Sequence, residues 1–469
     1  MADHTELTAD DATDWVTAHA DQILQHLTEL VAIPSIAFPG YDRTVLDTSA
    51  EAVKALMTRA GFDQVEILSE PLDPKQPDGD RGGPAVLAHR APAPGAPTIL
   101  LYAHHDVQPT GDLALWDTDP FTATRIGDRL YGRGAADDKA GIMVHVAAVT
   151  ALNELLGPDH GLGITVLIEG EEEVASPTFR AFLDRHRDKL AADVVVVADS
   201  ANWAEGVPAI TSSLRGVVDG TIHVKILDHA VHSGLFGGVV LDAATVLSKV
   251  IATLHDEHGD VAIPGLHKTP GQAQVDYPEE DLRAQAGIVD SVRLAGTGSI
   301  AERLWHKPAL SILGTDLPEL NHASNTIIPQ ARAKFSLRIG PGVNPDEAMQ
   351  RVREHVESLD IFGAEITLEP GEKGSPFSTD LDSATTQLML SCLRDAFGTD
   401  PVATGLGGSI PLTGDLAEVF PEATILITGV EDPNTRAHSA NESLYLPDFY
   451  RGITAEILLL ARLLNRAGS

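Results

Sequence analysis

Apolar residues recur at helical spacing in two segments near the N-terminus. The spacing predicts helices over 13–31 and 46–60, the first ended by Pro34 and the second by Gly61. Between residues 70 and 97 the chain is rich in Pro, Gly and Asp, and we expect an irregular connection there.

Short, continuous apolar runs follow, of the kind that forms buried strands. Their β-branched composition predicts strands over 97–107, 163–168, 193–198 and 423–429, and a longer apolar stretch predicts a helix over 140–156. Runs of this kind that alternate with helices are typical of an α/β fold, with a mainly parallel sheet covered by helices on both faces.

The pattern changes in the middle of the chain. Apolar and polar residues alternate over 217–226 and 331–339, which is typical of an antiparallel sheet with one face exposed. We therefore expect three segments: the two parts of a catalytic α/β domain over 1–214 and 376–469, and an inserted α+β domain over 215–375.

Composition narrows the function classes. The 469 residues carry 33 Lys and Arg against 68 Asp and Glu, a formal net charge of -35. This charge disfavours nucleic acid and anionic membrane surfaces as partners, because both require clustered cations. With 43% hydrophobic residues, the chain has enough apolar material for a buried core.

A single cysteine, Cys392, allows neither an internal disulfide nor a thiolate metal cluster, which favours a cytoplasmic location. The acidic first residues do not resemble a signal peptide, and we expect no membrane span because no apolar run approaches about 20 residues.

Metal-ligand residue types lie at or soon after the ends of the predicted strands. In open α/β sheets ligands bind beyond the carboxyl ends of the strands. Each residue alone has an ordinary explanation: a polar strand end, a solvated loop at 171–173, or a helix cap at 137–138. Their recurrence in five segments instead predicts a site for Zn²⁺, Mn²⁺ or Co²⁺, built from His104, Asp106, Asp137, Glu172, Glu173, Asp199 and His438.

Several longer segments carry a specific resemblance. The sequence resembles the di-zinc exopeptidase family that includes carnosine dipeptidases, glutamate carboxypeptidase, aminoacylase and succinyl-diaminopimelate desuccinylase, with the greatest likeness to the dipeptidase branch. The matching segments appear in the family's order: 102–109 (YAHHDVQP), 130–139 (LYGRGAADDK), 169–176 (EGEEEVAS), Asp199, 232–238 (HSGLFGG), 326–329 (TIIP), 335–338 (FSLR), 407–411 (GGSIP) and 438–442 (HSANE).

The resemblance implies a role for each residue of the predicted metal site. Asp137 would bridge two metal ions, with His104 and Asp199 completing one site and Glu173 and His438 the other. Glu172 would be the general base, and Asp106 would orient His104 or the region of the base. The resemblance also implies a cis peptide bond between Asp137 and Asp138, and it leaves His105 as a non-ligand.

The inserted domain gains a role by the same resemblance, as a lid that mediates dimerisation. His232 would reach the active site of a partner subunit in a homodimer and stabilise the oxyanion. Arg338 would hold the substrate's C-terminal carboxylate, with Thr326 and Ser409 as further substrate contacts. Dipeptidase relatives usually carry Arg and Glu where this chain has Gly405 and Leu406, so carnosine-type specificity is not expected to carry over.

The predicted function is metal-dependent hydrolysis of an amide bond in dipeptides or short peptides with a free C-terminal carboxylate. One alternative is an N-acyl-amino-acid deacylase or desuccinylase of the same architecture. A non-catalytic metal-binding relative is a third possibility, although neither the base nor any ligand is missing. A serine hydrolase is disfavoured because Ser409 lies outside a G-x-S-x-G elbow.

Overall fold

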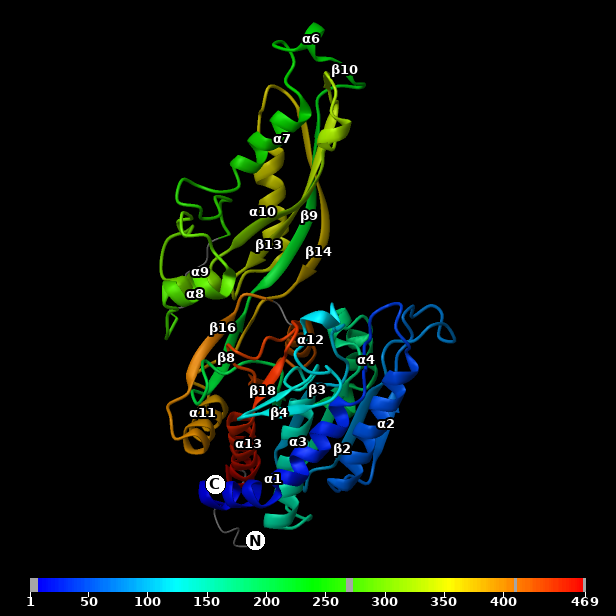
Figure 1. Cartoon of the computed structure of the whole chain (residues 1–469), viewed down its shortest axis with the longest axis vertical. Helices are drawn as coiled ribbons and strands as arrows, with labels where there is room; N and C mark the ends of the chain where they lie inside the picture. The colour runs from blue at the N-terminus through cyan, green and yellow to red at the C-terminus, as the bar shows by residue number, and fades with distance from the viewer. Residues whose placement is uncertain (1–6, 267–272, 409–410, 467–469) are drawn as a thin grey trace. The chain divides into compact units, whose positions relative to one another are not determined.

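The computed structural model describes residues 7–266, 273–408 and 411–466 (Figure 1). The chain forms two compact units, each with its own core. Unit 1 comprises Met1–Ser212, Thr379–Thr404 and Asp415–Ser469, and unit 2 comprises Ser213–Ser378 and Gly405–Gly414. The second unit is therefore an insertion into the first, with a short later segment added to it.

A six-stranded mixed sheet forms the centre of unit 1. The order is β1 (Val65–Leu68), β2 (Ala85–Arg90), β6 (Gly163–Glu169), β3 (Thr98–His104), β7 (Val194–Val197) and β17 (Thr424–Ile427). The last four of these are parallel neighbours, whereas β2 runs antiparallel to both β1 and β6. The α/β prediction with a mainly parallel sheet holds for these four strands.

The prediction of an irregular connection over 70–97 is wrong at β2. The six residues of this strand lie between Pro84 and Pro92, and the prolines and glycines around them conceal the short apolar run. Val86 and Leu87 are buried, and β2 pairs with a strand on each side. Tertiary pairing along both edges stabilises a segment whose local composition favours a loop.

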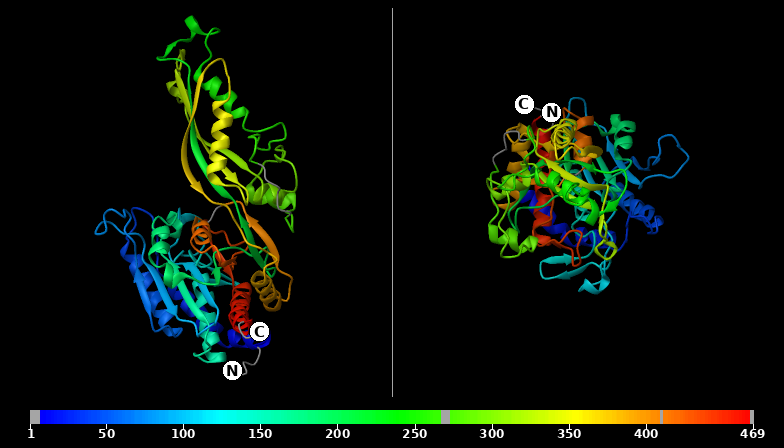
Figure 2. Two further views of the ribbon diagram at one scale, coloured as in Figure 1. Left: turned by 180° about the vertical axis from the view of Figure 1, so that it is seen from behind. Right: turned by 90° about the horizontal axis from the view of Figure 1, so that it is seen from above.

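Helices cover both faces of this sheet. Alternate residues of β3, including Ile99 and Leu101, enter a core shared with α1 (Ala9–Val31), α2 (Thr44–Arg59), α3 (Lys139–Leu156), α11 (Ala384–Phe397) and α13 (Leu446–Arg466). Tyr102 points to the other face, where its ring meets Phe179 of α4 (Phe179–Arg185) edge to face at 5.9 Å. Helices α1 and α13 pack against each other, and Figure 2 shows them close together in blue and red.

Helix α3 is the one described helix that is long and apolar enough to cross a membrane by length and composition, and 72% of that segment is buried inside the fold. It packs on β3 and against α1 and α13, which is the position of a core helix. Its apolar character is therefore explained by burial within unit 1.

Unit 2 is built on a four-stranded antiparallel sheet. The order is β11 (Ala309–Asp316), β13 (Gln330–Ile339), β9 (Gly216–Lys225) and β14 (Glu365–Gly374). Along β9 and β13 alternate residues are buried, and α7 (Ala243–Ala252) and α10 (Pro345–Glu357) cover the apolar face. The alternation predicted for 217–226 and 331–339 thus gives a sheet with one covered face.

Smaller elements complete the described fold. In unit 2 these include α6 (Ser233–Phe236), α8 (Glu279–Ala286), α9 (Ile300–Trp305) and the two-stranded pair β10 (Val231–His232) and β12 (Thr326–Ile327). Unit 1 adds α5 (Arg187–Leu190), α12 (Pro411–Val419, whose first residues fall in unit 2) and the sheet β18 (Ser443–Tyr445), β5 (Arg129–Tyr131), β4 (Thr124–Ile126). Where the chain crosses between units it forms the sheet β15 (Phe377–Ser378), β8 (Ala209–Leu214), β16 (Val402–Leu406).

Candidate dinuclear metal centre

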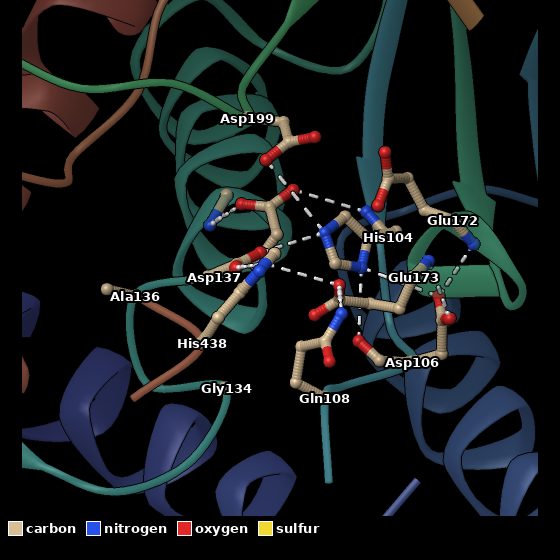
Figure 3. A network of polar contacts seen from close by, with 12 residues as sticks. His104, Asp106, Gln108, Gly134, Ala136, Asp137, Glu172, Glu173, Asp199 and His438 are labelled. Carbon is tan, nitrogen blue, oxygen red and sulfur yellow. Dashed lines mark hydrogen bonds and ion pairs between the residues drawn. The ribbon is translucent and has the colours of Figure 1, made fainter. Parts of the chain in front are cut away.

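The predicted ligand residues of unit 1 meet at the carboxyl ends of its parallel strands (Figure 3). His104 is the last residue of β3, and Asp199 lies two residues beyond the end of β7. Glu172 and Glu173 open a 3₁₀ turn just after β6, Asp137 lies two residues before α3, and His438 lies in the loop between β17 and β18. Parallel strands bring their carboxyl ends to one edge, which is why these distant segments meet.

Asp137 lies at the centre of the cluster. Its Oδ1 is 3.1 Å from Nε2 of His104, and its Oδ2 is 3.0 Å from Nε2 of His438. Each carboxylate oxygen of Asp137 thus faces a different imidazole. Each imidazole also has a second carboxylate beside it. Asp199 lies 3.9 Å from Nε2 of His104, and Glu173 lies 3.3 Å from Nε2 of His438.

Two sets of three potential ligands result, His104 with Glu172 and Asp199, and Asp137 with Glu173 and His438. In each set the ligand atoms lie within 4.8 Å of one another. A third set, Asp137 with Asp199 and Glu431, overlaps both. Oxygen and imidazole donors gathered in this way fit divalent cations such as Zn²⁺ or Mn²⁺.

The electrostatics of the cluster also favour cations. Burial raises the pKa of Glu173 to about 7 and that of Asp199 to about 6, and nearby carboxylates add to both shifts. Burial and the charge of Asp199 likewise raise the pKa of Glu172 well above its usual range. Burial opposes ionisation of Asp137 too, yet its contacts with the two histidines hold its pKa below the ordinary value. Crowded carboxylates of this kind are stabilised in the ionised form by bound metal ions.

Asp106 is hydrogen-bonded to the backbone of the 3₁₀ turn. Its two carboxylate oxygens accept the backbone N–H groups of Glu172 and Glu173, each at 3.1 Å. Its carbonyl oxygen lies 3.0 Å from Nδ1 of His104, opposite the ring nitrogen that faces Asp137. Gln108 donates to Glu173 Oε2 at 2.6 Å. Asp106 therefore orients both the histidine and the paired glutamates.

Glu442 is a structural partner of the site that the sequence reasoning did not single out. Its buried carboxylate accepts the backbone N–H groups of Gly134, Ala136 and Asp137 at 3.1–3.2 Å. It also accepts from Arg133 Nη1 at 2.6 Å. Its place in the segment HSANE, four residues after His438, was the available signal. Glu431 was missed as well, since it follows β17 without a motif of its own.

Other residues around the site have structural partners. Nε2 of buried His105 lies 2.7 Å from the carbonyl oxygen of Pro84, and the residue belongs to none of the three ligand sets. Glu171 is buried and accepts the backbone N–H groups of Gly83 and Thr178, so the ordinary reading of 171–173 as a solvated loop is wrong. The peptide bond between Asp137 and Asp138 is cis, as the resemblance implied.

The remaining predicted site residues belong to unit 2 or lie outside the described residues. His232 and Thr326 are direct partners in the β10–β12 pair, and both are exposed. Nδ1 of His232 accepts the backbone N–H of Gly234 at 3.0 Å. Arg338 lies near the end of β13 and is half-buried. Ser409 falls outside the described residues. Within unit 2 the structure thus brings His232 and Thr326 together and places Arg338 in the central sheet.

Comparison with known proteins identifies the class of protein. The model of the peptidase family M20/M25/M40 matches residues 100–462. A cysteinylglycine-S-conjugate dipeptidase from Corynebacterium striatum is 34% identical over 92% of this chain and 92% of its own length. The β-Ala-His dipeptidase of Homo sapiens is 28% identical over 93% of this chain and 89% of its own length. The chain belongs to this M20 peptidase family.

Solved structures agree on the fold. Human carnosine dipeptidase 1 matches with a TM-score of 0.73 and 25% identity, covering 97% of this chain and 99% of that one. The yeast dipeptidase Dug1p matches with a TM-score of 0.75 and 22% identity, over 98% and 99%. The predicted family, and with it a metal-dependent hydrolase of the dipeptidase type, is confirmed. The candidate ligand sets of this chain are consistent with the dinuclear metal dependence of the M20 family.

Proposed function

We propose that this enzyme cleaves the amide bond of dipeptides or short peptides that end in a free carboxylate. The observation that carries this proposal is the position of Asp137, with each carboxylate oxygen facing one imidazole and one outer carboxylate beside each ring. The dipeptidase relatives, similar over nine-tenths of the chain, support the choice of peptide substrates.

In this proposal Asp137 would be shared by two divalent cations, since each of its carboxylate oxygens faces a different imidazole. His104 and Asp199 would hold one ion, and Glu173 and His438 would hold the other. Zn²⁺ is the preferred ion, and Mn²⁺ or Co²⁺ suit the same ligands. Two such ions supply Lewis acidity and lower the pKa of a water molecule toward neutrality.

Glu172 acts as the general base in the proposed mechanism. It accepts a proton from the attacking water and returns it to the leaving amine. Asp106 fixes the backbone of Glu172 and so keeps the carboxylate at the carboxyl end of β6. The neighbouring Glu173, whose backbone is held by the same side chain, points to His438 and serves as a ligand instead.

Unit 2 supplies the proposed substrate contacts. Arg338 binds the C-terminal carboxylate through its planar guanidinium, and Thr326 and Ser409 make lesser contacts. His232 acts on the oxyanion in the partner subunit of a homodimer. The exposure of His232 and Thr326 leaves both available for such contacts.

The substitution Glu172→Gln tests the mechanism. It retains the size of the side chain and removes the proton acceptor, so we expect a loss of turnover of roughly 10²- to 10⁴-fold with metal content unchanged. Glu257→Gln is the control, since the Glu257 side chain is 87% exposed. Turnover of the Glu172 variant equal to that of the control would refute the role of the base.

A substrate panel separates peptide hydrolysis from the alternative, deacylation of N-acyl amino acids. Matched pairs such as Ala-Leu and N-acetyl-leucine share the C-terminal residue and differ only in the group removed. We expect turnover of the dipeptides, and exclusive turnover of the acyl compounds would overturn the proposal.

A further inference from the structure

Arg215 is a buried cation in unit 2 that no motif assigned to a function. The residue is 8% exposed, and among the described residues its guanidinium donates only to backbone carbonyls: Nε to Gly407 at 3.0 Å, and Nη1 to Arg303 and Lys307 at 3.4 Å. Within the part of the chain that the structure describes, no carboxylate lies at ion-pair distance from Arg215. A buried charge without a counter-charge is costly, so this arrangement calls for an anion.

The strand register places Arg215 beside Arg338. Val217 of β9 is paired with Arg338 of β13, and Arg215 precedes Val217 by two residues. Leu337 and Ile339 point into the core of unit 2, so Arg338 lies on the opposite face of the sheet. Residues two apart along extended chain share a face, which makes the two arginines diagonal neighbours. Burial and the charge of Arg338 accordingly lower the pKa of Arg215 to about 10.

The segment around Gly407 keeps this charge uncompensated. A Cβ at Gly407 would lie 2.8 Å from Nη2 of Arg215, so a side chain there would displace the guanidinium. The backbone N–H of Arg215 donates to the carbonyl of Leu406 at 3.2 Å. A Cβ at Gly405 or Gly407 would point toward Ser213 or Arg215, so Leu406 between them faces the other side of the strand, and no side chain at 405–407 offsets the charge of Arg215.

We propose that Arg215 and Arg338 together form a dicationic subsite that selects substrates whose C-terminal residue carries a second carboxylate, as in dipeptides ending in Glu or Asp. This inference rests on the proposed function, in which Arg338 holds the substrate's main-chain carboxylate. Arg215 acts as a specificity-determining residue by adding a second positive charge in a region of low dielectric constant. Its own hydrogen bonds hold it in place, so selection comes from charge and costs no side-chain ordering.

The test compares Ala-Glu with its neutral isostere Ala-Gln. We expect kcat/KM to be roughly tenfold higher for Ala-Glu in the unmodified enzyme. Arg215→Gln removes the second positive charge and should bring the ratio close to one, while Arg215→Lys, which retains a positive charge, should retain a preference for Ala-Glu. Thermal unfolding of both variants checks that the fold is retained, and hydrolysis of Ala-Leu, which lacks the second carboxylate, checks that the catalytic centre is intact.

The outcomes separate this inference from the function on which it rests. If neither dipeptide is hydrolysed, the proposed function fails. If both are hydrolysed at equal rates by the unmodified enzyme, or if Arg215→Gln leaves the ratio unchanged, the dicationic subsite is overturned while the peptidase function stands.

Discussion

The two units of this chain each gather like charges, and they do so with opposite sign. In unit 1, Asp137, Glu172, Glu173 and Asp199 crowd around two imidazoles at the strand ends, and burial raises the pKa of the outer three carboxyls. In unit 2, Arg215 lies just before β9, on the side of the antiparallel sheet that carries Arg338. The crowded carboxylates of unit 1 favour divalent cations, and in unit 2 we propose that a substrate carboxylate offsets the buried charge of Arg215. The comparison leads us to propose that buried groups of like charge mark the ligand sites of both units.

Removal of the negative charge at the centre of unit 1 should have the largest effect. Asp137→Asn retains the shape of the side chain but loses the charge that both imidazoles face, so we expect a turnover loss of at least roughly 10³-fold. Metal analysis after dialysis should show loss of bound ions. Asp47→Asn, on the exposed surface of α2, is the control. Full metal content in the Asp137 variant would show that the carboxylate does not bridge.

Replacement of Glu442, which binds the backbone of the loop that carries Asp137, should have a smaller effect. The carboxylate of Glu442 accepts hydrogen bonds from three backbone N–H groups. In Glu442→Gln an N–H₂ donor replaces one of its oxygens and can no longer accept these bonds. We expect metal affinity to fall about 10- to 100-fold, as for other residues that orient ligands. Isothermal titration with Zn²⁺ measures this, with the exposed Glu66→Gln as control. Unchanged affinity together with a lower Tm would assign Glu442 a purely structural role.

On the cationic side, Arg338→Lys tests carboxylate binding in unit 2. Lysine retains the charge but loses the planar fork, so KM for dipeptides should rise roughly tenfold while kcat changes little. Arg332→Lys is the matched control, because Arg332 lies on the same strand and the same face and pairs with the exposed Asp316. Equal KM in both variants would place the carboxylate elsewhere.

The smallest predicted effect is the pH dependence of stability that comes from a buried His–Glu pair in unit 1. Burial alone would lower the pKa of His145, but its contact with Glu456, at 2.8 Å, raises it above the ordinary value. The contribution of the His145–Glu456 pair to the free energy of unfolding is therefore fully present below about pH 6.5. It is lost as pH rises through the higher pKa of His145 in the folded state. Guanidinium unfolding of wild type and His145→Gln at pH 6 and pH 9 should show a free-energy difference that is larger at pH 6. A difference that grows with pH would contradict the charged pair.

Much of the fold follows from local periodicity. The helices α1 and α2 and the strands β3, β6, β7, β9 and β13 lie within a few residues of their predicted positions, because their apolar spacing directly reflects burial. Strand β2 was missed because it is stabilised by neighbours on both edges, not by its own composition. Glu442 and Arg215 were missed for a similar reason: the segment HSANE contains Glu442, but most partners of Glu442 and Arg215 are backbone groups whose proximity only the folded chain shows.

The sequence by itself determined the classes of element, the family and the residues available to bind metal. These depend on residue type and spacing, which the chain carries locally. Only the tertiary structure decided which oxygen of Asp137 faces which histidine, that Glu442 holds the Asp137 loop, and that Arg215 lies beside Arg338 without an acidic partner among the described residues. Such relations depend on the pairing of segments up to three hundred residues apart, because charge balance is a property of packed side chains and not of their order along the chain.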